Sequence, residues 1–240
     1  HVFFKFMVKT IAEKHGLRAT FMPKPFENLT GNGCHAHISL WNGSKNLFLD
    51  NGDKLGLSRL AYNFLGGILY SAEPLTAFFN PSINSYRRID APATTSGATW
   101  SPSKISYTGN NRTHMIRVPD PGRFELRLMD GSVNPYLLQA GIIAAGTDGM
   151  EKKRDPGQPL FVNMYTDGDN YPNIKRLPSD LESALEHLST SEVLLSILGK
   201  NNITSYLKLK ENELKDFNSK ETFSKKKPIT DWEKTNTLDC

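Results

Sequence analysis

Two short stretches alternate side chains with a period of two, and they constrain the fold more than any other feature of this chain. In residues 34–39 the polar side chains of His35, His37 and Ser39 occupy every second position. In residues 123–128 charged side chains alternate with apolar ones. Because successive side chains of a strand point to opposite faces of a sheet, both stretches predict half-buried strands.

Helical periodicity marks other parts of the chain. Apolar residues at helical spacing between positions 4 and 11 predict a first helix. Ser58 is suited to cap a second helix, which we expect to end near Pro74. An asparagine followed by a proline at positions 134–135 is typical of a helix start, and this helix is predicted to run to about residue 150.

The remaining predicted elements are shorter. Strands are predicted at residues 20–22, 115–118 and 124–129, and further helices follow a capping box at 179–182 and cover 192–198 and 204–217. A segment rich in Pro, Ser, Thr and Gly runs from residue 80 to about 109. A loop of this length inside a compact domain is usually functional or mobile. The chain is therefore expected to place strands and a functional loop first and a helical C-terminal third after them.

Composition excludes several classes of protein. The 240 residues carry a formal net charge of +4, and the run of three lysines from Lys225 to Lys227 is interpreted as a solvated linker. This pattern predicts no nucleic-acid partner. No apolar run approaches the roughly 20 residues of a membrane helix and no signal peptide is visible, so no membrane partner is expected. Cys34 and Cys240 give no disulfide framework, which fits a cytoplasmic protein.

The arginine-rich middle third indicates the chemistry. Glu125 lies between two arginines, and neighbouring cations keep a carboxylate ionised and suited to a hard metal ion. Guanidinium groups bind carboxylates and phosphates through paired hydrogen bonds, so several of them suit ATP phosphates together with a dicarboxylate. Five arginines in this part of the chain are singled out here: Arg88, Arg112, Arg117, Arg123 and Arg127. No P-loop or G-x-S-x-G motif is present.

Two plainer interpretations stay open on the residues alone. The charged strand around Glu125 can be a surface strand with ion pairs, which are usually worth about 0–1 kcal/mol. His35 and His37 can be two exposed histidines on a half-buried strand. Short motifs match by chance often enough that neither run decides the function by itself.

Four sequence blocks in a fixed order resemble the catalytic domain of the glutamine synthetase family. They occupy residues 21–25, 31–41, 80–88 and 111–137, within a region of roughly residues 20–150. The resemblance implies an α+β fold with an antiparallel-rich curved sheet and flanking helices, an architecture shared with guanidino kinases. It also implies that residues 1–240 form a C-terminal catalytic domain.

The resemblance implies a role for each matching residue. The family makes γ-glutamyl phosphate from ATP and glutamate, and an amine then displaces the phosphate. The implied metal is Mg²⁺ or Mn²⁺, held by His35 and Glu125. The implied ATP contacts are His37, Ser39, Arg112, Arg117 and Arg123. The implied glutamate contacts are Gly31, Arg88 and Arg127. Arg112 and Arg127 are the implied catalytic residues, with Arg112 best placed to stabilise the transferring phosphoryl group.

One segment departs from the common pattern of the family. Ammonia-using members carry a glutamate a few positions after the equivalent of Arg88, whereas residues 88–92 here read Arg-Ile-Asp-Ala-Pro, and Asp90 is the only nearby acid. This segment resembles the branch that includes γ-glutamylmethylamide synthetase, also called glutamate–methylamine ligase. Trp100 can bind methylammonium by a cation–π contact, or it can simply pack the loop.

The predicted function is therefore ATP-dependent formation of a γ-glutamyl amide from glutamate and ammonia, with methylamine as the alternative acceptor. A non-catalytic structural homologue is a candidate from another class. However, a site without catalytic activity would have no reason to retain Glu125, His35 and five arginines together. A guanidino-kinase-like phosphotransferase is a third candidate, and the histidine strand and the helix start at 134–135 favour the synthetase. The family's shared active sites imply a ring-like homo-oligomer.

The isolated chain is expected to be incomplete, because it begins at His1 inside a helical pattern. In the family, the other metal ligands are glutamates upstream of the matching region, and a small N-terminal domain completes the neighbouring subunit's site. We predict that the isolated residues 1–240 do not synthesise the amide from ATP, glutamate and ammonium. Robust product formation in that assay would refute this prediction.

Overall fold

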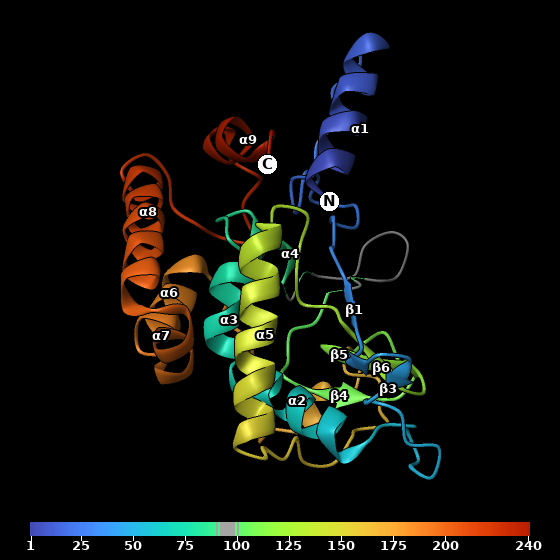
Figure 1. The fold of residues 1–240 in the computed structure, drawn as a ribbon. Helices are drawn as coiled ribbons and strands as arrows, with labels where there is room; N and C mark the ends of the chain where they lie inside the picture. Colours follow the sequence, from blue (N-terminus) through green and yellow to red (C-terminus); the bar gives the residue numbers. More distant parts are fainter. Residues whose placement is uncertain (90, 92–98, 100) are drawn as a thin grey trace.

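The strands predicted at residues 34–39, 115–118 and 124–129 meet in one small sheet (Figure 1). The computed structural model describes the whole chain except residues 90, 92–98 and 100. The order across the sheet is β1 (Ala36–Ile38), β6 (Arg123–Leu126), β5 (Ile116–Asp120) and β4 (Tyr107–Thr108). β6 pairs antiparallel with both β1 and β5, whereas β4 pairs parallel to β5. A separate hairpin joins β2 (Trp41–Asn42) to β3 (Lys45–Asn46).

Helices make up most of the remaining structure. They are α1 (Val2–Lys14), α2 (Arg59–Tyr70), α3 (Ala72–Phe79), α4 (Ser85–Arg88), α5 (Pro135–Glu151), α6 (Leu181–Ser189), α7 (Glu192–Leu198), α8 (Lys200–Asn218), α9 (Asp231–Thr237) and a 3₁₀ turn, η1 (Gly168–Asn170). α5 packs against α2 and α3, while α6, α7 and α8 form a neighbouring group and α1 projects from the body (Figure 1). None of the described helices is long and apolar enough to cross a membrane.

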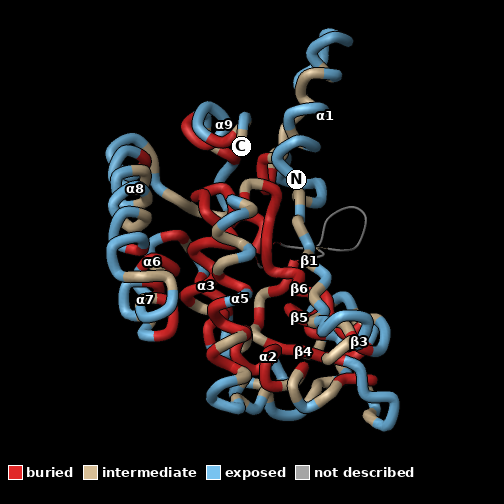
Figure 2. Tube along the Cα trace, viewed as in Figure 1, coloured by how far each residue is buried: buried red, intermediate tan, exposed pale blue. Residues whose placement is uncertain are grey.

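The apolar face of the sheet packs on α2 and on the segment before it. The ring of Phe124 in β6 stacks on Phe48 with 5.8 Å between centroids, and Phe64 of α2 lies 6.2 Å from Phe124. These rings belong to the buried core between the helices and the sheet (Figure 2). Because side chains alternate along a strand, the face of β6 opposite Phe124 carries Glu125. The predicted alternation therefore separates the core from the charged residues.

The predicted caps at two helix starts are confirmed. The Ser58 hydroxyl accepts a hydrogen bond from the Ala61 amide at 3.2 Å, and the Asn134 side chain accepts from the Tyr136 amide at 2.9 Å. Each cap satisfies an amide that has no partner within the first helical turn. These two caps set where α2 and α5 begin.

Two local predictions near proline and threonine are wrong. Residues 20–22 form no strand; the Thr20 hydroxyl instead donates to the Leu238 carbonyl at 2.6 Å, which ties this segment to the C-terminus. Pro74 does not end a helix, because α2 has already ended at Tyr70 and Pro74 lies in the first turn of α3. A proline is tolerated there, since amides of the first turn have no intrahelical partner.

The remaining corrections concern one helix cap and three elements that were not predicted. The cap of α6 is Asp180, which accepts from the Ser183 amide at 2.8 Å, and not the preceding serine. The segment 80–109, expected to be a loop, contains α4 and β4. α9 was not predicted, although its start carries a complete capping box between Thr230 and Glu233.

Glycines allow α2 and α5 to approach closely. A Cβ atom on Gly67 of α2 would lie 2.0 Å from the Ala145 carbonyl oxygen, and one on Gly149 of α5 would lie 2.2 Å from the Asn63 carbonyl oxygen. Both distances are far below van der Waals contact. The partner atoms are helix backbone, so the two helices could accept a side chain only by moving apart.

We therefore expect Gly149→Ala to lower the free energy of unfolding by about 1–3 kcal/mol, because overpacking outweighs the better helix propensity of alanine. Gly52→Ala is the matched control, since its Cβ would meet only the Asp50 side chain at 3.4 Å, an ordinary contact. The control should stay within about 0.5 kcal/mol of the parent chain. Urea unfolding measures both, and equal stability of the two variants would contradict the close packing.

Candidate active site

The register between β1 and β6 brings the two predicted motifs together. His37 pairs directly with Glu125, and the antiparallel ladder continues through Ile38 and Phe124. Residues directly opposite in such a ladder point to the same face. His35, two residues before His37, therefore shares this face with Glu125, and the two strands form one polar surface.

Glu125 is the centre of this surface. Its Oε2 accepts from Arg117 Nη1 at 2.8 Å and its Oε1 accepts from Arg127 Nη1 at 2.9 Å. His35 Nδ1 lies 3.1 Å from the same Oε1 atom. Burial alone would raise the pKa of Glu125, but the hydrogen bonds and charges of the two arginines outweigh burial and hold its pKa below the ordinary value. The carboxylate is therefore ionised at neutral pH.

His35 is neutral at the same pH. Burial lowers its pKa to about 4, and the positive charges of Arg127 and Arg88 act in the same direction. A neutral imidazole keeps a free lone pair, which is the form that binds metal ions. The carboxylate of Glu125 and the imidazole of His35 are thus both in their ligand forms.

The donor set of His35 and Glu125 fits a divalent cation. Neighbouring ligands of an octahedral ion with bonds of about 2.1 Å lie about 3.0 Å apart, close to the 3.1 Å between His35 Nδ1 and Glu125 Oε1. Arg127 Nη1 also lies close to both atoms, 3.3 Å from His35 Nδ1 and 2.9 Å from Glu125 Oε1. Among the described residues, no group of three or more His, Cys, Asp or Glu side chains could hold a metal. These two residues therefore supply only part of a coordination shell.

The residues for which the family resemblance implies ATP contacts lie on the outer part of the surface. Arg123 Nη1 lies 2.6 Å from His37 Nδ1, and Arg123 also pairs with Asp120. Ser39 is exposed, and its hydroxyl accepts from Trp41 Nε1 at 3.0 Å. The outer surface is thus open to solvent and rich in donors.

Arg112 is apart from this cluster. It is exposed, and within the described part of the chain no hydrogen bond or ion pair engages its guanidinium group. Its segment is fixed by His114, which is fully buried and contacts the Ser106 hydroxyl at 3.0 Å and the Val162 carbonyl at 2.9 Å. Among the described residues, therefore, nothing neutralises the charge of Arg112.

The residues matched to glutamate contacts lie on the inner side. Arg88 is 3% exposed, and its Nη1 donates to the Leu128 carbonyl at 3.0 Å. A Cβ on Gly31 would lie 3.4 Å from the Arg88 side chain and 2.2 Å from the Pro23 carbonyl oxygen, so only glycine fits this approach. Arg127 Nε is buried and has no hydrogen-bond partner in the structure as described.

The structure thus brings seven of the ten predicted site residues into one connected cluster, and Gly31 lies beside Arg88 at its edge. The connected residues are His35, His37, Arg88, Arg117, Arg123, Glu125 and Arg127. Within the described part of the chain, Ser39 and Arg112 form no hydrogen bond or ion pair with these seven residues. Asp90 and Trp100, singled out for the acceptor, lie outside the described residues.

Sequence reasoning missed one buried acid beside the cluster. Asp130 is fully buried; burial raises its pKa, and the charge of Arg88 opposes that shift. Its carboxylate accepts from the Ser132 amide and hydroxyl at 2.9 Å and 2.6 Å, and its backbone bridges to Gly33. The turn sequence Asp-Gly-Ser directly after the arginine-rich strand was the available signal. Asp130 thus joins residues 31–33, named here the glycine-rich approach, to the end of β6.

Comparison with known proteins identifies the family of this chain. A family model described as the glutamine synthetase catalytic domain matches residues 1–229. The chain belongs to the glutamine synthetase family. It is 55% identical over 241 residues to a glutamine synthetase of Rhizobium meliloti (strain 1021), with 100% of the chain and 54% of that protein covered. It is 42% identical over 244 residues to a glutamate–methylamine ligase of Methyloversatilis universalis, with 100% and 53% covered.

Solved structures of this family share the fold. A structure described as a GmaS/ADP complex is 53% identical, has a TM-score of 0.86, and is matched over 99% of this chain and 53% of that chain. An apo GmaS structure without ligand is 50% identical with a TM-score of 0.84, and is matched over 100% of this chain and 52% of that chain. The predicted family and its α+β fold are therefore confirmed. The chain spans about half the length of the relatives it matches.

His114 should make the stability of the chain depend on pH. Burial lowers its pKa from the ordinary value of 6.5, so below that pH the unfolded chain binds more protons than the folded one. The free energy of unfolding is then expected to fall between pH 7 and pH 5, by up to about 1.4 kcal/mol per pH unit from this group. Above pH 7 the contribution is constant.

The comparison is with His114→Gln, whose side chain does not titrate. Urea unfolding at pH 5, 6 and 7 gives the slope for each protein, and the difference between the slopes isolates His114. The substitution should flatten the slope even though it lowers stability overall. Parallel slopes would show that His114 titrates normally in the folded chain.

Proposed function

We propose that this chain is the catalytic domain of an ATP-dependent ligase that forms a γ-glutamyl amide from glutamate and ammonia through γ-glutamyl phosphate. The observation that carries the proposal is the contact of Glu125 with His35, Arg117 and Arg127 at 2.8–3.1 Å. One buried carboxylate, one neutral imidazole and two guanidinium groups on one sheet face suit a metal-bound polyphosphate beside an acidic substrate.

His35 and Glu125 would hold Mg²⁺ or Mn²⁺. The bound ion would neutralise charge on the ATP phosphates during phosphoryl transfer. The remaining ligands would come from water, from phosphate oxygens or from protein groups outside residues 1–240, since magnesium often keeps several such ligands. His37, Ser39, Arg117 and Arg123 would contact ATP from the outer surface.

Arg88, Arg127 and the backbone at Gly31 would bind glutamate. A dicarboxylate needs guanidinium groups on both ends, and Arg127 Nε is a buried donor without a partner in the described residues. The close approach of Gly31 to Arg88 leaves backbone groups near that arginine. The inner side of the surface therefore suits the carboxylates and the outer side suits the nucleotide.

Methylamine is the second candidate acceptor. Two GmaS structures at 53% and 50% identity and a glutamate–methylamine ligase at 42% identity favour it, while the 55% identical glutamine synthetase favours ammonia. The segment from Arg88 to Pro92 also lacks the glutamate that ammonia-using members carry.

We further propose a homo-oligomer with active sites shared between subunits, as in the family.

The deciding experiment uses the natural protein that contains these 240 residues. Initial rates are measured with ATP, Mg²⁺ and glutamate, and with ammonium or methylamine as the acceptor. We expect amide formation that depends on ATP and is lost on chelation of the metal. The larger kcat/KM identifies the acceptor. A protein that makes neither amide under these conditions would be the non-catalytic homologue.

Arg112 provides a sharp test of its proposed role at the transferring phosphoryl group. We expect Arg112→Gln to lower kcat by about 10³-fold, as loss of a transition-state arginine does, while KM for ATP changes little. Stability should not change, because the side chain is exposed and unpaired among the described residues. Lys208→Gln, which removes an exposed charge from α8, is the control and should keep full activity. Equal activity of both variants would exclude a catalytic role for Arg112.

A further inference from the structure

A segment near the C-terminus holds the chain on both sides of Arg88. Residues 223–233, named here the C-terminal clamp, lie more than 130 positions away in sequence. Arg87 donates from Nε and Nη2 to the two carboxylate oxygens of Glu233, both at 2.6 Å. On the other side of Arg88, the Ile89 carbonyl accepts from Lys225 Nζ at 2.8 Å. The residues before and after Arg88 are therefore both fixed by the C-terminal clamp.

The contacts of Arg87 leave its guanidinium group fully enclosed. Beyond Glu233, it donates to three backbone carbonyls of the clamp at 2.8–3.1 Å. The ring of Phe223 covers it, with 5.5 Å from the guanidinium carbon to the ring centroid. Its side chain is 4% exposed and that of Glu233 is fully buried. A bidentate pair of this kind fixes direction as well as position.

Glu233 links the clamp to the glycine-rich approach as well. Its Oε1 also accepts from Asn84 Nδ2 at 3.1 Å. The Asn84 side chain in turn accepts from the Lys24 amide at 2.7 Å and donates to the Lys24 carbonyl at 3.1 Å. The neighbouring Pro23 carbonyl accepts from the Asn32 amide at 2.8 Å. Hydrogen bonds through Asn84, together with the peptide bond between Pro23 and Lys24, thus connect Glu233 to Asn32, the residue next to Gly31.

We propose that Arg87 and Glu233 are positioning residues for glutamate, which act by orienting Arg88 through the C-terminal clamp. This proposal rests on the proposed function. α4 has four residues, too few to hold its own conformation, so the direction of Arg88 must be imposed from outside. Catalytic sites tolerate little misplacement of such a group. Glu233 lies beyond residues 1–229, which the family model matches.

The main test is Glu233→Gln in the natural protein that contains this chain. Glutamine keeps the shape but removes the charge, and its amide cannot accept two bonds from Arg87. We expect KM for glutamate to rise about tenfold or more, with kcat and KM for ATP within about threefold of the parent. A loss spread equally over all three parameters, or no change in KM for glutamate, would overturn the proposal.

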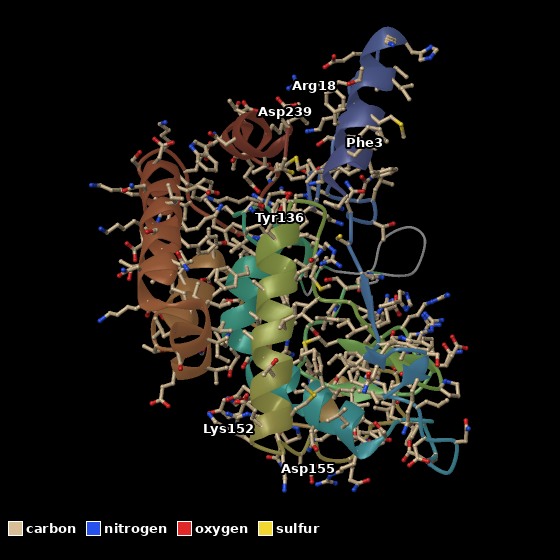
Figure 3. The ribbon with its side chains drawn as sticks, viewed as in Figure 1. Phe3, Arg18, Tyr136, Lys152, Asp155 and Asp239 are labelled. Carbon is tan, nitrogen blue, oxygen red and sulfur yellow. The ribbon has the colours of Figure 1, made fainter. Side chains whose placement is uncertain are left out.

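A double-mutant cycle with Arg88→Lys separates positioning from general stability. If Glu233 acts through Arg88, Glu233→Gln should add little to the KM for glutamate once Arg88 is replaced. Additive effects of the two substitutions would mean that Glu233 does not act through Arg88. Asp239→Asn is the control, because it breaks the exposed Arg18–Asp239 pair of 2.6 Å at the chain end (Figure 3) and should leave all three parameters unchanged.

Two further outcomes remain decisive. If Glu233→Gln does not fold, Glu233→Asp takes its place, since it keeps the charge and only shortens the side chain. The same rise in KM for glutamate is expected for this variant. An unchanged KM for glutamate would contradict the proposal. Failure of the proposed function has a different signature, because the parent protein itself would then make no γ-glutamyl amide.

Discussion

The pairing of β1 with β6 is the constraint on which the site depends. In this register Phe124 and Leu126 enter the core while Glu125 faces His37 and lies within 3.1 Å of His35. A slip of one residue would turn Glu125 into the core and the apolar side chains toward the site. Burial of the rings between β6 and α2 therefore holds the charged cluster in place.

The charged surface does not stabilise the chain by itself, which supports the proposal that it binds a ligand. Several cationic groups meet around the single carboxylate of Glu125, and Arg127 keeps one buried donor without a partner in the described structure. Such an arrangement is unfavourable without an anion, so the core and the helix packing elsewhere must stabilise it. The orientation of Arg88 depends in turn on the C-terminal clamp, because α4 is too short to keep its own conformation.

Predictions from sequence succeeded where the controlling interactions are local. The caps at Ser58 and Asn134 and the strand at residues 123–126 follow from adjacent residues, and each is confirmed. The expected half-burial of this strand is wrong, because Glu125 on its charged face is buried as well. The strand predicted at residues 20–22 is wrong, because the Thr20 hydroxyl bonds to the distant Leu238 carbonyl and local propensity does not report such a contact. The resemblance to the family identified the site residues by motif, but their roles in binding stay predictions.

The sequence by itself determined the family, the strands that carry His37 and Glu125, and the caps of the main helices, because short-range periodicity and motif order encode them. Tertiary structure decided which residues meet. The contacts of Glu125 with Arg117 and His35, the burial of Asp130, and the pair between Arg87 and Glu233 join positions 8 to 146 residues apart. Only the folded chain brings such groups together, since burial and strand register act across the whole domain.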